Sequence, residues 1–215
     1  MLQQKNKQTH VLIDAGHGSN TPGKGSPYSL SGVLPAIEFR EWKWTREIAD
    51  RIVSELRCRG IEANLLVTEQ YDVSLLERVK RVNEKCRMYG KDNVLVISIH
   101  NNALGMGDKW ENNARGWSVW TSVGQTKSDL LAEYLFTRAK ENFKDMRLRS
   151  DVTDNDNDCE SQFYILRKTL CPAVLTENFF MTAEEDLKYI LSNKGKDAIV
   201  ATHIQGIMDY IQNQV

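Results

Sequence analysis

Short β-favouring runs that alternate with amphipathic segments constrain the fold of this chain more than any other feature. Helical periodicity is clearest where Trp44, Ile48, Ile52 and Leu56 recur every fourth position, before a helix stop at Gly60. Further segments with this periodicity span residues 74–88, 128–143 and 197–211. The β-favouring runs span residues 11–14, 63–67, 94–100, 117–121 and 173–176. Strands that alternate with helices predict an α/β domain of three layers, a mostly parallel twisted sheet flanked by helices.

Composition narrows the class of protein. A length of 215 residues suits one domain with a real core, and 41% hydrophobic with 27% charged residues is typical of a folded globular chain. The formal net charge of −1 gives no electrostatic footprint for nucleic acid or for an anionic membrane. No apolar run approaches the roughly 20 residues of a transmembrane helix. The first ten residues lack the apolar core of a signal peptide, so we expect no cleaved leader.

The segment from Gly18 to Lys24 has the pattern G-x-x-x-x-G-K, which raises the hypothesis of a phosphate-binding loop. Such a loop needs Ser or Thr after the lysine, whereas this chain has Gly25. It also needs a helix to begin at once, so that amides face the phosphates. No helical pattern starts here before about Glu41. We therefore reject a nucleotide site.

Polar side chains stand where three of the apolar runs are predicted to end. His17 follows the first run, the third run ends at His100, Glu177 follows the fifth, and Glu41 opens the first amphipathic helix. In open α/β sheets, sites form at the carboxyl ends of strands, so these side chains would meet at one rim. Two histidines and one carboxylate with an open fourth position make a catalytic zinc set. A further carboxylate would supply the general base.

Each of these residues also has a simpler interpretation. A histidine at a strand end is most often a polar terminus, and a glutamate at a helix start is a favourable partner of the helix dipole. The other two histidines, His10 and His203, have no supporting context, and we expect them to face solvent. Residues 20–40 and 103–115 follow strand ends that carry a histidine, and we expect them to be loops that wall a cleft.

Five motifs occur in the order found in one known family. D-P-G-H-G occurs as DAGHG, S-I-H-x-N-A as SIHNNA, and P-A-V-L-x-E as PAVLTE. A glutamate helix and an L-x-x-R-x-x-x-A-N motif align with Glu41, Thr45, Ala49, Leu75, Arg78, Val82 and Asn83. From about Val11 to Leu191, the chain therefore resembles the zinc-dependent N-acetylmuramoyl-L-alanine amidases of the Amidase_3 family.

The resemblance implies a set of site residues. It implies that His17, Glu41 and His100 bind Zn²⁺ and that Glu177 is the catalytic glutamate. Glu38 competes with Glu41 for the second ligand position, but the spacing to the downstream alanine and the start of the apolar stripe favour Glu41. The zinc site would then lie at the carboxyl ends of the strands.

The resemblance also implies a function and a domain plan. The expected reaction is hydrolysis of the amide between N-acetylmuramic acid and L-alanine of the peptidoglycan stem peptide, within a catalytic domain of residues 9–215 that follows an N-terminal extension of residues 1–8. Two alternatives stay open: a peptidoglycan-binding protein without turnover, and a zinc peptidase that cuts within the stem peptide. The protein would act on the cell wall, as a host autolysin or as a phage-type endolysin made in the cytoplasm and released.

Some positions depart from the family. Thr45 replaces the usual Asn and Ala15 the usual Pro, and neither change removes a ligand. Phe179 stands where the family often has glycine, so a bulky ring is expected near Glu177. The loop between the first two ligands is longer than usual, so its substrate contacts do not carry over. Asp14 either orients His17 or is a strand-end carboxylate that faces water.

Other features have plainer interpretations. Three tryptophans could stack on sugar faces, namely Trp110, Trp117 and Trp120. The alternation in WSVW nevertheless predicts that at least one of them packs in the core. The run DVTDNDND superficially resembles an EF-hand loop, but it lacks the glycine and has Ile165 where the closing glutamate should be, so we reject calcium and expect a solvated loop. Among the cysteines, Cys58 and Cys86 are expected to be buried free thiols, and a bridge between Cys159 and Cys171 stays open.

Overall fold

The computed structural model describes residues 8–27, 38–152 and 156–214, which form one domain around a six-stranded sheet. The strands are β1 (His10–Ala15), β2 (Glu62–Leu65), β3 (Val94–Asn102), β4 (Ser118–Thr121), β5 (Cys159–Glu160) and β6 (Ala173–Phe180). Their order across the sheet is β2-β1-β3-β6-β4-β5. β4 pairs antiparallel with β6, and the other neighbouring strands pair in parallel. The mostly parallel sheet predicted from the sequence is confirmed.

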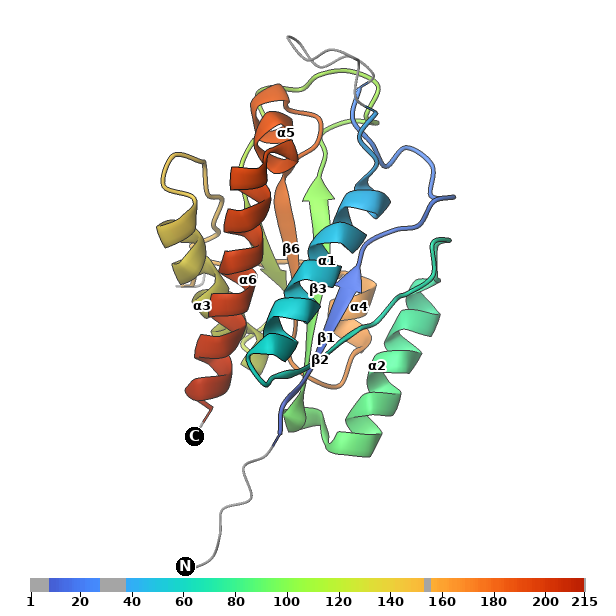
Figure 1. Ribbon diagram of the computed structural model, residues 1–215, viewed down its shortest axis with the longest axis vertical. Coiled ribbons are helices and arrows are strands. Elements are labelled where there is room, and N and C mark those ends of the chain that lie inside the picture. The colour runs from blue at the N-terminus through green and yellow to red at the C-terminus, as the bar shows by residue number, and fades with distance from the viewer. Residues whose placement is uncertain (1–7, 28–37, 153–155, 215) are drawn as a thin grey trace, which may run out of the picture.

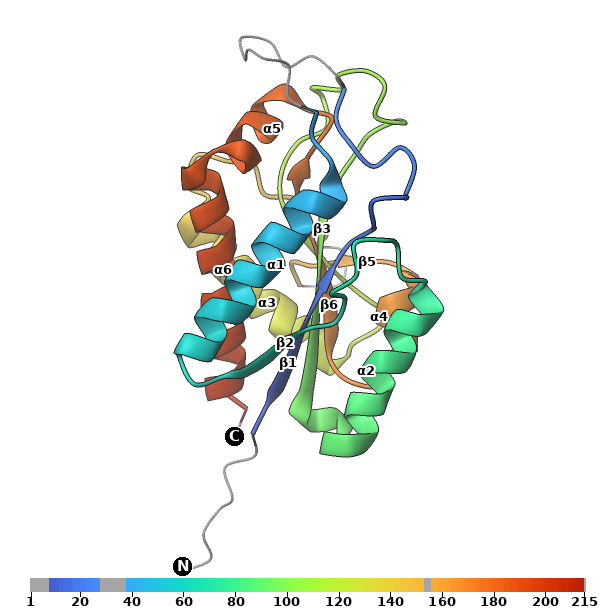
Figure 2. The same cartoon turned by 45° about the vertical axis from the view of Figure 1, so that its right-hand side comes forward.

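Helices cover both faces of this sheet, as Figure 1 and the turned view in Figure 2 show. The helices are α1 (Glu41–Cys58), α2 (Leu75–Tyr89), α3 (Lys127–Asn142), α4 (Tyr164–Lys168), α5 (Glu184–Leu191) and α6 (Asn193–Gln212), with a 3-10 turn η1 (Lys91–Asn93). α1, α3 and α6 form one outer layer, and α2 with α4 forms the other. The three-layer arrangement is therefore also confirmed.

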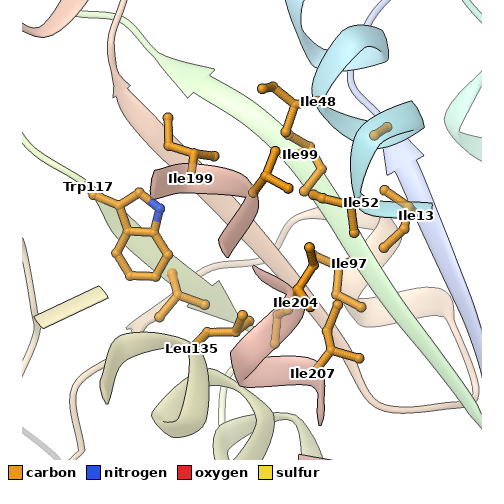
Figure 3. Close-up of a cluster of buried hydrophobic side chains, with 14 of the residues drawn as sticks. Ile13, Ile48, Ile52, Ile97, Ile99, Trp117, Leu135, Ile199, Ile204 and Ile207 are labelled. Carbon is orange, nitrogen blue, oxygen red and sulfur yellow. The ribbon is translucent and has the colours of Figure 1, made fainter. Parts of the chain in front are cut away.

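The core is divided between the two faces because successive side chains of a strand point to opposite sides. On β1, Val11 and Ile13 join the larger cluster under α1, α3 and α6, whereas Leu12 joins the smaller cluster under α2 and α4. Figure 3 shows isoleucines of β1, β3, α1 and α6 meeting beside Trp117 and Leu135. Each such side chain stabilises the fold by roughly 1.5–3 kcal/mol when fully buried.

Strand boundaries differ from the sequence expectation at two places that matter for the site. β3 and β6 continue beyond their apolar runs, so His100 lies within a strand rather than at its end, and Glu177 lies within a strand rather than after it. Strand pairing continues past the polar residues because it depends on backbone hydrogen bonds. The predicted strand ends were instead placed where the side chains become polar. The sequence analysis also missed β5, α4 and α5, which are too short to show a clear period.

The predictions about burial were wrong for His203 and for Cys58. His203 on α6 is fully buried, not solvent-facing, and its ring bonds Thr176 on β6. Cys58 is exposed, whereas Cys86 is buried as expected. All four cysteines are free thiols in the described structure, so Cys159 does not pair with Cys171.

Parts of three predicted segments lie outside the described residues, namely residues 1–7 of the N-terminal extension, 28–37 of the first long loop and 153–155 of the acidic run. The described remainder of the first long loop contains no helix before α1 begins at Glu41. Across the described ranges, the helices are too short or too polar for any of them to cross a lipid bilayer.

Candidate active site

His17 follows β1 in a turn whose geometry depends on two glycines. Its backbone φ is 60°, in the left-handed region that histidine enters more readily than branched residues do. A Cβ on Gly16 would lie 2.4 Å from Cε1 of His100, and one on Gly18 would lie 2.0 Å from the backbone nitrogen of Asp72. Side chains are excluded at both positions, so the Gly-His-Gly sequence lets the imidazole of His17 stand at the edge of the His100 ring, with centroids 4.9 Å apart.

Glu41 enters the site from the first turn of α1 and is fully buried. Its backbone N–H donates to the carbonyl of Lys24 at 3.1 Å, which fixes the start of the helix. Its Oε1 accepts a hydrogen bond from the backbone N–H of Asn101 at 2.9 Å. Glu38, the competing candidate, instead accepts from the exposed side chain of Arg40. The structure thus brings Glu41, and not Glu38, to the histidines.

His100 and Glu177 are register partners on the adjacent strands β3 and β6. Because paired residues of neighbouring strands share a face of the sheet, their side chains lie side by side. Ser118 on β4 pairs with Glu177 from the other side. The parallel pairing therefore places Glu177 next to His100.

Three potential ligands converge on one point at the carboxyl ends of the strands. Nε2 of His17 lies 3.4 Å from Oε2 of Glu41, and Nδ1 of His100 lies 3.1 Å from Oε1 of Glu41. One ligand atom from each residue lies within 4.8 Å of the others, and no other group of three His, Cys, Asp or Glu residues in the described ranges meets this criterion. Oε2 of Glu41 is buried and has no hydrogen-bond partner. A metal ion shared with the imidazoles would satisfy this oxygen, so the three residues fit a metal centre.

The electrostatics of the group agree with this fit. Burial lowers the pKa of His17 to about 4, against the attraction of Glu41, so its ring is neutral near pH 7. Burial also acts to lower the pKa of His100, but its hydrogen bond and charge interaction with Glu41 outweigh this and raise it. Burial would raise the pKa of Glu41, yet the two histidines hold it below its usual value. Burial raises the pKa of Glu177 to about 7, although His100 and Lys24 oppose the shift.

Arg78 on α2 holds the turn that carries His17. Its guanidinium donates to Asp14 at 2.6 Å, to the carbonyl of Ala15 at 2.7 Å and to the carbonyl of His17 at 3.2 Å. Asp14 is 1% exposed, and its second oxygen accepts from Ser98 at 2.6 Å. The interpretation of Asp14 as a carboxylate that faces water was wrong, whereas a part in orienting His17 fits the structure in an indirect form. Asp14 positions the turn through Arg78.

Sequence reasoning assigned no role to several other residues that hold the backbone of the site. Nδ2 of Asn178 donates to the carbonyl of His100 at 3.0 Å, and Nδ2 of Asn101 donates to the carbonyl of Asn178 at 2.7 Å. Arg46 on α1 donates to the carbonyl of His17 at 3.0 Å. The two asparagines lie just beyond the predicted strands, directly after the candidate ligand and base, and both are buried in the observed strands β3 and β6. Buried polar groups need partners, and that signal could have identified them.

The ring of Phe179, expected from the sequence near Glu177, packs in the hydrophobic core. Its side chain is fully buried and packs edge-on against Phe143 and Tyr189, with ring centroids 5.1 Å away in each case. Its backbone φ is 66°, a conformation that suits glycine and is strained for an aromatic residue. The ring therefore serves the core, and the positive φ is a physical reason for glycine at this position in the family.

The two long loops approach each other at the rim. A Cβ on Gly107 would lie 2.8 Å from the carbonyl of Gly25, so the described parts of both loops are in close contact. Among the tryptophans, Trp117 is fully buried in the core, as predicted for at least one of them. Trp110 and Trp120 are half-buried.

Comparisons with known proteins point to one family. Residues 11–209 match the model of the family Amidase_3, described as N-acetylmuramoyl-L-alanine amidase. The chain is 25% identical over 204 residues to an endolysin of Bacillus phage SPP1 and 26% identical over 200 residues to the N-acetylmuramoyl-L-alanine amidase CwlM of Bacillus licheniformis. These alignments cover 94% and 92% of this chain, which spans 65% and 66% of the two relatives.

Solved structures show the same architecture. The N-acetylmuramoyl-L-alanine amidase of Clostridium difficile 630 superposes with a TM-score of 0.78 at 25% identity, covering 97% of this chain and all of the other. The catalytic domain of CwlV from Bacillus (Paenibacillus) polymyxa var. colistinus shares the fold with a TM-score of 0.74 at 19% identity, covering 95% of this chain and 99% of that one. Because the family model matches nearly the whole chain, the protein belongs to the Amidase_3 family of N-acetylmuramoyl-L-alanine amidases.

Proposed function

We propose that this protein is a zinc-dependent amidase that hydrolyses the bond between N-acetylmuramic acid and the L-alanine of the peptidoglycan stem peptide. The observation that carries the proposal is the convergence of His17, Glu41 and His100, with Glu177 beside them on the neighbouring strand. Family membership supports the substrate, and the named relatives support action on the bacterial cell wall. Both a host autolysin and a phage-type endolysin fit this role.

Zn²⁺ suits the three donors better than a harder ion does. Imidazole nitrogens with one carboxylate form a typical catalytic zinc set, whereas Mg²⁺ and Ca²⁺ prefer oxygen ligands alone. His17, Glu41 and His100 would hold the ion. When bound, Zn²⁺ supplies Lewis-acid polarisation of the scissile carbonyl and lowers the pKa of water.

Glu177 is the proposed general base and acid. Its Oε2 is buried and has no hydrogen-bond partner, so it is free to accept a proton from the attacking water. Its pKa of about 7 lets it accept a proton and then release it to the leaving amine nitrogen of L-alanine near neutral pH. Hydrogen bonds of Asn178 and Asn101 join β3 to β6 next to His100 and Glu177, and so hold the general base beside the metal ligand.

The test is digestion of purified peptidoglycan with mass spectrometry of the products. Wild type should release intact stem peptides and leave glycan free of peptide. A sample stripped by a chelator should lose this activity and regain it with Zn²⁺. Glu177→Gln should keep its bound zinc and lose at least about 100-fold in turnover, because it lacks the base. Glu47→Gln, an exposed change on α1, is the matched control and should remain active.

Other products would contradict the proposal in distinct ways. Cleavage within the stem peptide would indicate a zinc peptidase. Zinc binding and peptidoglycan binding without any release of peptide would indicate a binding protein. Full activity of Glu177→Gln would remove Glu177 from the reaction.

A further inference from the structure

A second group of carboxylates lies beside β5, the strand that forms one edge of the sheet. Asp158 directly precedes this strand and is only 3% exposed, which contradicts the solvated loop expected from the sequence for this residue. The hydroxyl of Thr121, itself fully buried on β4, donates to Oδ2 of Asp158 at 2.5 Å. The other oxygen, Oδ1, is buried and has no hydrogen-bond partner. An ionised carboxylate in this state is strongly unfavourable unless a positive charge approaches it.

The charges that surround Asp158 are themselves negative. The carboxyl group of Asp156 lies within hydrogen-bonding reach of Asp158, and Asp129 at the start of α3 adds a third carboxylate nearby. Burial, followed by these two charges, raises the pKa of Asp158 to about 7, although the Thr121 hydroxyl opposes the shift. Two carboxyl groups held this close need either a shared proton or a cation between them.

The local chain holds Asp156 and Asp158 in this arrangement. Asn157, which separates them, donates from Nδ2 to the carboxylate of Glu133 on α3 at 2.9 Å. Immediately afterwards, Cys159 and Glu160 pair with Trp120 and Thr121 of β4. The segment is therefore attached to α3 on one side and to the sheet on the other, and these attachments bring the oxygens of the two aspartates together.

We propose that Asp156 and Asp158, with Thr121 orienting Asp158, bind a calcium ion at this edge of the sheet. All the donors are oxygens, which calcium prefers, and the irregular backbone suits calcium better than magnesium, which requires near-octahedral geometry. The sequence argument against calcium rested on EF-hand spacing. It does not apply to a site made by two alternate aspartates and a neighbouring strand.

This site is separate from the proposed zinc centre. Ser118, which pairs with Glu177, precedes Thr121 by three residues on β4, about 10 Å along an extended strand. The ion would attach the 156–158 segment to β4 and α3, and so it would stabilise the fold without taking part in hydrolysis. Its presence or absence does not depend on the proposed amidase function.

The experiment uses the full chain loaded with one equivalent of zinc, so that the His17 centre is filled. Terbium luminescence, sensitised by Trp120 on the neighbouring strand, reports binding, and calcium should displace the terbium. Calcium should also raise the midpoint of thermal unfolding, with half-saturation at about 10⁻⁴–10⁻³ M as in extracellular calcium modules. Asp158→Asn should weaken both responses at least about tenfold because ligand charge sets calcium affinity. Asp156→Asn should do the same, and Asp50→Asn, an exposed change on α1, should not.

Three results bear on the proposal in different ways. Equal calcium responses in wild type and in both variants would place the ion elsewhere on the molecule and overturn it. No response in wild type, together with stabilisation at mildly acidic pH that Asp158→Asn removes, would also overturn it and show that the aspartates share a proton instead. Loss of amidase activity with an intact calcium response would count only against the zinc centre, and the calcium site would stand.

Discussion

Arg78→Met tests how the fold holds the candidate metal site. Methionine keeps most of the length and apolar volume of the arginine stem but removes the guanidinium. That group donates to the carbonyls of Val73, Ala15 and His17 and to the carboxylates of Asp14 and Asp72. The substitution therefore removes the positive partner of Asp14 and the restraint on the turn that carries His17.

The expected cost is large because the pair is buried. The side chains of Arg78 and Asp14 are 3% and 2% exposed, so the lost partner cannot be replaced by bulk water. Removing one member of such a pair typically costs about 3–5 kcal/mol, a large part of the about 5–15 kcal/mol that holds a domain folded. Because His17 would lose a backbone partner, zinc affinity should also fall by about tenfold or more.

A double-mutant cycle separates the pair from general damage. Urea unfolding of the zinc-free protein would be measured for wild type, Arg78→Met, Asp14→Asn and the double variant. The asparagine introduced by Asp14→Asn would still accept the Ser98 hydroxyl but would carry no charge, so the double variant should be clearly more stable than the sum of the single changes predicts. Arg59→Met is the control, since Arg59 pairs with Glu55 at the surface of α1 and should cost under about 1 kcal/mol.

Two outcomes would refute this reasoning. If Arg78→Met cost no more than Arg59→Met, the buried ion pair would not contribute to stability as the structure implies. If the free-energy changes were additive to within about 0.5 kcal/mol, Arg78 and Asp14 would act independently, and Asp14 would not position the turn through Arg78.

Three other positions, each buried or crowded, give further predictions. His203 has its pKa lowered to about 4 by burial, so the unfolded chain binds more protons below pH 6.5, and stability should fall by up to about 3 kcal/mol between pH 6.5 and 4; urea unfolding of His203→Gln should lack this component. Gly16→Ala would place a Cβ 2.4 Å from the His100 ring, and titration should show at least about tenfold weaker zinc binding. Phe179→Gly should be about 1 kcal/mol more stable than Phe179→Ala in thermal unfolding, because both lose the ring but only glycine accepts φ near 66° freely.

A specific result or control would test each of these predictions. An unchanged pH profile in His203→Gln would mean that this ring does not control acid stability. Gly60→Ala is the control for Gly16→Ala. Gly60 follows the far end of α1 and has a φ of 77°, so this variant should lose stability but not zinc affinity. If alanine were better than glycine at position 179, the left-handed backbone there would be wrong.

Much of the candidate site was predictable because its residues interrupt strong local patterns. His17, His100 and Glu177 follow or sit within apolar strands, and Glu41 opens an amphipathic helix, so each was visible as a polar residue where a core residue was expected. The parallel sheet then brings them together, since adjacent parallel strands end at the same edge. The choice of Glu41 over Glu38 rested on spacing along the helix, and the geometry agrees with it.

The errors have a common cause. Because they are polar, His203 and Asp158 were expected to face water, and this was one of two interpretations of Asp14, yet all three are buried. Local sequence does not show the partner that makes burial of a polar group tolerable. For Asp14 that partner is Arg78, 64 positions away along the chain, and for His203 it is Thr176 on a different element. The position of the Phe179 ring was not predictable for a similar reason. The direction in which a side chain points depends on the backbone angle φ, and the type of residue does not reveal that angle.

By itself, the sequence determined the layered α/β class, four of the six α-helices in the described ranges and the identity of the residues that gather at the rim. These features could be predicted because they depend on periodicity and short motifs, which reflect interactions between residues close together in the sequence. Only the tertiary structure decided which buried polar groups find partners, that Asp14 holds the His17 turn through Arg78, and that Asp156 meets Asp158 behind Thr121. These outcomes depend on contacts between distant elements, because desolvation and pairing act through space rather than along the chain.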